Sequence, residues 1–140
     1  MQTLVKITPE RWEYRDNSDV FLLSKKNIDL LVSLIPDSGI VRINAHKDYS
    51  DKVQEMFIAI RQDYKMQLHC HFNKSESFHI IRGEMDVVLN EDENTIKQIV
   101  SLSEHDVFYY RLDQPLYHRV VPKTHIVVFH EVTTGPFIQE

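Results

Sequence analysis

The sequence contains a single cysteine, so the chain cannot form an internal disulfide. It also lacks an apolar run that approaches the roughly 18–20 residues of a membrane-spanning helix. Its N-terminal segment Met1–Glu10 has no apolar core of the kind a signal peptide needs. These absences predict a protein of the reducing cytoplasm without a membrane partner. The formal net charge is −5 and no basic cluster is present, which argues against a nucleic-acid-binding surface.

The hydrophobic content is 42% over 140 residues, which is enough for the core of one domain. From residue 53 onward, short apolar runs are separated by polar turns, the pattern typical of β-strands. The predicted strands are Val53–Ile60, Tyr64–His71, Glu76–Ile81, Glu84–Asn90, Thr95–Leu102, Val107–Leu112, Tyr117–Val121 and Ile126–Val132. Many short strands at this spacing predict an all-β, antiparallel jelly-roll barrel.

A short helix is predicted before these strands. Ser24 fits a helix N-cap, apolar residues follow at helical spacing, and Pro36 and Gly39 end the pattern. We expect this helix to cover one end of the barrel. The run Val20–Leu23 predicts a further short strand.

We expect the whole chain, residues 1–140, to be a single domain. Residues 1–52 would form an N-terminal arm, the helix and an irregular loop, and residues 53–137 would form the barrel.

The most specific feature of the sequence is a pair of histidines, His69 and His71, followed by Glu76 and Gly83. Side chains alternate between the faces of a strand, so the two imidazoles project the same way. A turn after His71 would let the next strand bring Glu76 beside them. Gly83 fits a tight turn that needs a positive φ. Because imidazole and carboxylate groups bind transition metals, the pattern predicts a metal site built on a hairpin.

The spacing H-x-H-x4-E-x6-G over residues 69–83 is similar to the first motif of the cupin superfamily. In that superfamily a second motif supplies a further histidine a few residues after a proline, and Pro115–His118 corresponds to it. The resemblance implies a cupin jelly-roll β-barrel that holds one divalent transition metal ion per chain. The implied ligands are His69, His71, Glu76 and His118. Zinc, iron, manganese and nickel all suit this set.

A narrower likeness covers residues 25–137. The segments Arg42–His46, Val53–Met56, Glu76–His79 and His130–Phe137 resemble those of WbuC-type cupins, small metalloproteins of bacterial surface-polysaccharide gene clusters. This resemblance implies a small-molecule ligand, such as a sugar or nucleotide sugar, but no particular reaction. Cupins commonly pair through sheet edges, so a homodimer is expected.

Four residues are candidates for binding the substrate. Arg42 and His46 match positions typical of the WbuC-type family, although the alternative is a solvated loop with ordinary ion pairs. Tyr109 and Arg111 share one face of their predicted strand, where they would line a pocket for a hydroxylated anion. The alternative is that aromatic residues fill the barrel and Arg111 pairs with a surface carboxylate.

The other histidines are weaker candidates. His79 falls on the face opposite Glu76, so it is not expected to bind the metal. His130 and Glu131 alternate in the last strand, so at most one of them faces the barrel interior.

Three functions remain open at this point. The first is a metal-dependent sugar isomerase or epimerase, in which the metal assists proton transfer next to a carbonyl. The second is a non-catalytic module that binds or senses a small ligand and is stabilised by the metal. The third is an iron-dependent oxygenase.

Overall fold

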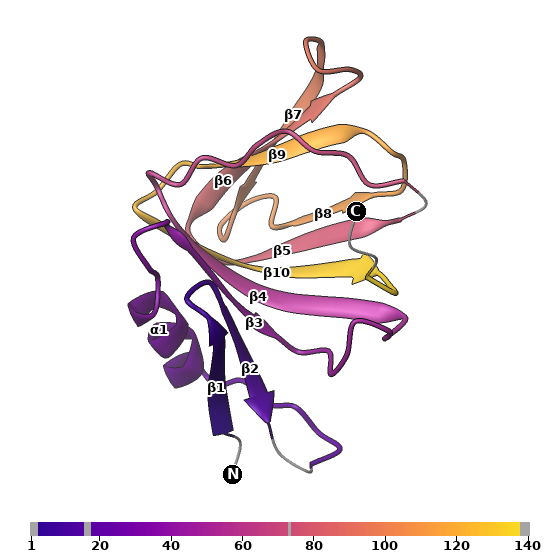
Figure 1. Ribbon diagram of the computed structural model, residues 1–140. Coiled ribbons are helices and arrows are strands. Elements are labelled where there is room, and N and C mark those ends of the chain that lie inside the picture. Colours follow the sequence, from indigo (N-terminus) through magenta and orange to yellow (C-terminus); the bar gives the residue numbers. More distant parts are fainter. Residues whose placement is uncertain (1–2, 16–17, 73, 138–140) are drawn as a thin grey trace.

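The structure is a computed structural model that describes residues 3–15, 18–72 and 74–137. The strands are β1 (Thr3–Thr8), β2 (Arg11–Arg15), β3 (Ile40–Asn44), β4 (Val53–Arg61), β5 (Glu76–Arg82), β6 (Glu84–Asn90), β7 (Ile96–Ser103), β8 (Tyr109–Leu112), β9 (Tyr117–Pro122) and β10 (Ile126–Thr134). They form a large sheet in the order β1-β2-β3-β4-β10-β5-β8 and a small one in the order β7-β6-β9. The small sheet lies over one face of the large sheet (Figure 1). The predicted all-β architecture is confirmed.

The alternation of side chains along β10 shows how the layers are built. Val127 and Phe129 point inward and join the core between the two sheets. Val128, between them, points outward and joins a second apolar cluster on the other face of the large sheet. All three are almost completely buried, so both faces of this central strand are covered. This explains its continuous apolar sequence.

Helix α1 (Lys25–Ser33) supplies the cover for the outer face of the large sheet (Figure 1). Ser24 caps its N-terminus, as predicted, by accepting a hydrogen bond from the Asn27 backbone N–H. Leu31 packs with Val41 of β3 and Val128 of β10. The prediction that the helix covers one end of the barrel is therefore wrong, because its apolar face meets the sheet itself. No helix in the described ranges is long and apolar enough to span a membrane.

The predicted strand Tyr64–His71 is absent. Tyr64 and Met66 pack against the core while Lys65 and Gln67 are exposed, so the alternation in the sequence is reproduced in the burial. The backbone, however, pairs with a neighbour only at His69, which forms an isolated bridge with His118. The segment is an extended chain laid on the core, and alternation alone cannot distinguish it from a paired strand.

The N-terminal region is more regular than predicted. β1 and β2 form an antiparallel hairpin, and β2 pairs in parallel with β3. These three strands belong to the same sheet as β4 and β10. The predicted strand Val20–Leu23 does not form. The single-domain assignment for residues 1–140 stays a prediction.

Candidate metal centre

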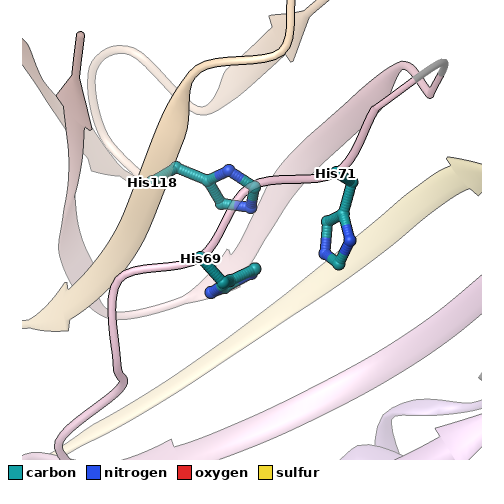
Figure 2. A group of neighbouring side chains, drawn as sticks. All are labelled: His69, His71 and His118. Atoms are coloured by element: carbon teal, nitrogen blue, oxygen red, sulfur yellow. The ribbon is translucent and has the colours of Figure 1, made fainter. Parts of the chain in front are cut away.

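Three of the four predicted metal ligands meet in one group. His69, His71 and His118 each place one potential ligand atom within 4.8 Å of those of the other two (Figure 2). His69 and His71 come from the extended segment before β5, and His118 comes from β9. The His69 backbone N–H donates to the His118 carbonyl over 3.1 Å, and the reverse hydrogen bond is 2.8 Å long. This backbone bridge ties the two parts of the site together.

The hydrogen bonds of two of these imidazoles determine which nitrogen is available to a metal. Nδ1 of His69 lies 3.0 Å from the Gln67 carbonyl oxygen, and Nδ1 of His118 lies 3.2 Å from that of Leu116. A carbonyl only accepts, so each Nδ1 carries the hydrogen that it donates. In the neutral imidazole the lone pair then resides on Nε2. Backbone hydrogen bonding of this kind orients metal-binding histidines.

Glu76 contacts this group through His118. Its Oε2 lies 3.1 Å from Nε2 of His118, and both side chains are buried. The contact lacks hydrogen-bond geometry: within the described residues, Nε2 of His118 and Oε1 of Glu76 are buried atoms without a hydrogen-bond partner. Buried polar atoms are normally satisfied. A metal ion would satisfy both, so the residues present fit a bound metal.

The protonation of the three histidines differs. Burial lowers the pKa of His69, and burial together with the adjacent imidazoles lowers the pKa of His71. Both are thereby kept in the neutral form that binds metal. Burial also lowers the pKa of His118, but the adjacent Glu76 carboxylate outweighs this effect, so its pKa is raised overall. Metal binding at His118 would displace the proton that this carboxylate favours.

A cavity of about 670 Å³ adjoins the histidines and is large enough for a small-molecule ligand. His69, His71 and Glu76 line it, and the predicted substrate residues Arg42 and His46 line it as well. Arg42 lies on β3, in the region predicted to be an irregular loop. The strand sets its side chain on the inner face of the large sheet.

Tyr109 and Arg111, the other two predicted substrate residues, do not line this cavity. Tyr109 is 50% exposed, and Arg111 donates to Asp113 over 2.9 Å at the surface. Tyr110, between them, is the residue that faces the core, where it packs against Phe78. The predicted face was wrong because β8 has tyrosines at consecutive positions. A shift of one residue exchanges the faces of a strand.

Glu131 is the functional candidate that the sequence left undecided. It lines the cavity, whereas His130 stacks on Phe57, with the ring centroids 4.5 Å apart. Burial, assisted by the negative charge of Glu76, raises the pKa of Glu131 from 4.5 to about 7. The inward alternation of Val127 and Phe129 would have indicated that Glu131 faces inward as well.

We expect the Glu131→Gln substitution to change the unfolding free energy of the metal-free protein more favourably at pH 8 than at pH 5. A carboxyl whose pKa rises on folding binds more protons in the native state, so its contribution to stability falls as pH rises from 4.5 to about 7. The difference in ΔΔG between the two pH values is on the order of 2–4 kcal/mol. Urea unfolding of both proteins at pH 5 and pH 8 measures it. Equal ΔΔG values at the two pH values would contradict the assignment.

The sequence and the structure were each compared with known proteins. The chain matches a family described as a domain of unknown function (DUF6016) over residues 41–102, a stretch that includes His69, His71 and Glu76 but not His118. No curated protein matches it.

Several solved structures resemble this one. An RmlC-like cupin family protein with a double-stranded β-helix fold from Methanocaldococcus jannaschii has a TM-score of 0.58 at 15% identity, covering 86% of this chain and 93% of that one. An L-ribose isomerase from Cellulomonas parahominis has a TM-score of 0.58 at 14% identity, and the match covers 68% of this chain and 60% of the isomerase chain. An HTH_3 family transcriptional regulator from Vibrio cholerae has a TM-score of 0.55 at 16% identity, and the match covers 81% of this chain and 62% of the regulator chain.

These likenesses establish the fold: the chain has the cupin jelly-roll architecture, in two facing sheets, with a histidine group that can hold a metal ion. The chain spans only about three fifths of the isomerase and of the regulator, at 60% and 62% of their lengths.

Proposed function

We propose that the protein is a metal-binding cupin that acts on a sugar or nucleotide sugar in bacterial surface-polysaccharide synthesis, as its resemblance to WbuC-type cupins implies. The proposal includes cytoplasmic location. It also includes a homodimer formed through a sheet edge, which a monomeric sedimentation mass would contradict.

One observation carries the proposal: the metal-binding group opens on a cavity. His69, His71 and Glu76 line the 670 Å³ cavity, while His118 is buried behind them. A metal held by these residues would be reached from the cavity side. Access of this kind separates a catalytic or ligand-binding metal from a closed structural one.

The residues around the cavity suit proton transfer next to a carbonyl. A bound divalent metal would polarise that carbonyl. Glu131 faces the same cavity from β10 and is the carboxyl group placed to accept the proton and return it. Met56, Ile58 and Phe129 supply an apolar wall that limits the access of water to this region. This arrangement favours isomerisation or epimerisation.

Deuterium exchange tests the proposed chemistry. The metal-loaded protein is incubated in D₂O with a panel of hexoses, pentoses and nucleotide sugars. We expect deuterium to be incorporated next to the carbonyl of at least one compound, detected by NMR, and incorporation to stop in the Glu131→Gln variant.

Other outcomes support the alternatives. Absence of exchange, with a metal saturated by protein ligands in the cobalt-substituted spectrum, would make the protein a non-catalytic ligand-binding module. Iron as the native metal, with substrate-dependent uptake of O₂, would make it an oxygenase.

A further inference from the structure

The charge of the cavity is opposite to that of the chain as a whole. The chain has 16 lysines and arginines against 21 aspartates and glutamates. The charged residues that line the cavity are the cations Arg11, Arg42, Lys65 and Lys74 and the anions Glu76 and Glu131. Glu76 is itself a proposed metal ligand, so a bound divalent ion would make the cavity more positive still. Positive charge gathered in a concave, low-dielectric site attracts anions.

Arg42 is a half-buried cation of this arrangement and lies on β3, in the middle of the strand. Other arginines have aspartate partners: Arg61 contacts Asp63 at 2.7 Å and Arg82 contacts Asp29 at 2.8 Å. In the described part of the chain the half-buried Arg42 guanidinium makes neither a hydrogen bond nor an ion pair closer than 4 Å. It therefore has five N–H donors available on the cavity wall, in a fork that matches a carboxylate or phosphate.

Asn44 extends this polar wall. It lies two residues beyond Arg42 on the same face of β3 and is only 6% exposed. It lines the cavity, and its Oδ1 is a buried atom without a hydrogen-bond partner among the described residues. A buried acceptor of this kind, left unpaired, carries an uncompensated desolvation cost. A ligand hydroxyl that donates to it would remove that cost.

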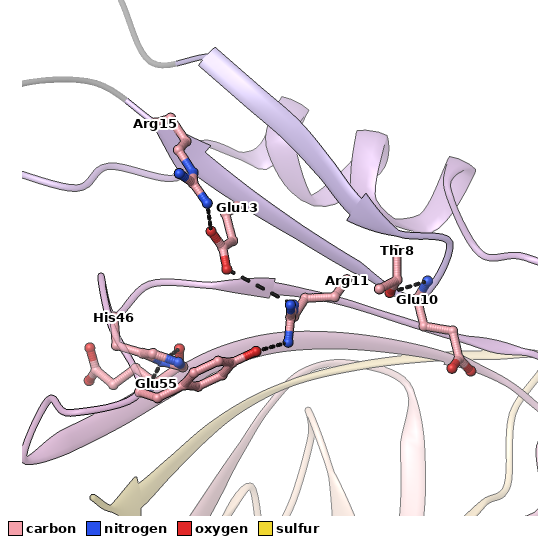
Figure 3. Close-up of polar contacts among 8 residues, drawn as sticks. Thr8, Glu10, Arg11, Glu13, Arg15, His46 and Glu55 are labelled. Carbon is pink, nitrogen blue, oxygen red and sulfur yellow. Dashed lines mark hydrogen bonds and ion pairs between the residues drawn. The ribbon is translucent and has the colours of Figure 1, made fainter. Parts of the chain in front are cut away.

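An aromatic wall lies at the rim of the cavity. The rings of Tyr49 and Phe137 pack with centroids 5.5 Å apart, and the Lys74 ammonium lies 5.6 Å from the Phe137 centroid. Arg11 donates to the Tyr49 hydroxyl and is also paired with Glu13, which in turn binds Arg15 (Figure 3). The hairpin β1–β2 thus holds a cation beside the aromatic pair. Arg11 and Lys74, each close to one of these aromatic rings, add positive charge to the rim of the cavity, which attracts an anionic ligand.

We propose that the ligand is an anionic sugar, whose carboxylate or phosphate group binds Arg42 and whose hydroxyl groups reach Asn44 and the metal. This proposal deepens the proposed function, and it rests on that function only for the statement that the ligand is a sugar. The anion site follows from the charges of the cavity and does not require that a reaction occur.

Calorimetric titration of the protein as purified tests the proposal, with D-glucose 1-phosphate, D-glucuronate and D-glucose as probes. We expect at least one anionic probe to bind about tenfold or more tightly than D-glucose, and Arg42→Gln to remove that preference, because hydrogen bonds between charged groups are stronger than those between neutral groups. The two anionic probes distinguish a phosphate from a carboxylate. Arg42→Lys, which keeps the charge but loses the fork, should retain an intermediate affinity.

Arg111→Gln is the matched control, because it removes an arginine from the outer surface, where Asp113 is its partner. It should change the affinities less than about twofold. Anionic probes that bind no more tightly than D-glucose, or equal losses in Arg42→Gln and Arg111→Gln, would overturn the proposal. Metal content is measured on each protein. A metal-free protein that still shows the Arg42-dependent preference would contradict the proposed metal function and leave the anion site standing.

Discussion

The His71→Ala variant is expected to lose stoichiometric metal binding. His71 is one of three imidazoles whose potential ligand atoms lie within 4.8 Å of one another, and it is the most exposed of them, so its removal does not open the core. Loss of a residue that only supports a ligand weakens metal binding by about 10–100-fold. We expect loss of a ligand to exceed that range. Titration with Zn²⁺ against a chromophoric chelator measures the affinity.

His79→Ala is the matched control for this experiment. His79 lies three residues after Glu76 on the opposite, exposed face of β5, beside Phe108. Its removal should leave the metal content and affinity unchanged. If His71→Ala retains one metal per chain, or if His79→Ala loses it, the assignment of the site is wrong.

The Gly83→Ala substitution is expected to destabilise the protein by about 2–5 kcal/mol. Gly83 has a φ of +86° at the turn where the chain passes from β5 in the large sheet to β6 in the small sheet. A left-handed conformation costs an L-residue about 1–2 kcal/mol. An added Cβ would also lie 2.4 Å from the Ile126 carbonyl oxygen, so backbone must move, at a further cost of about 1–3 kcal/mol. Urea unfolding measures the total.

Gly39→Ala separates these two contributions. Gly39 has almost the same φ, +88°, but there the nearest atom to an added Cβ is the Tyr64 Cβ at 3.2 Å. It should lose only the conformational part, about 1–2 kcal/mol. Equal losses in the two variants would show that the close approach of β10 to Gly83 has no energetic consequence.

The sequence could predict the histidine group of the candidate metal centre because its pattern is largely local. His69, His71, Glu76 and Gly83 lie within one short stretch, and their spacing relates directly to a turn and to neighbouring strands. His118 came from the resemblance to cupins, and the structure places it beside His69 through a backbone bridge. The positive φ predicted at Gly83 is confirmed.

The cavity wall was harder to predict because it is assembled from distant segments. Arg11 reaches it through the hairpin β1–β2, which pairs in parallel with β3, and no local pattern indicates such a pairing. Phe137 reaches the rim through a backbone hydrogen bond of 2.7 Å to the Tyr49 carbonyl. Tyr109 was placed on the wrong face because adjacent tyrosines leave the register of a short strand undetermined.

The most direct test of the account is elemental analysis of the protein purified without a chelator and without a metal-binding tag. We expect about one transition metal ion per chain in the native protein, and none in the His69→Ala/His71→Ala double variant. The identity of the metal would then direct the search for the reaction. A native protein that contains no metal, and takes up none on titration with Zn²⁺, Fe²⁺, Mn²⁺ or Ni²⁺, would contradict the central claim that these histidines form a metal site.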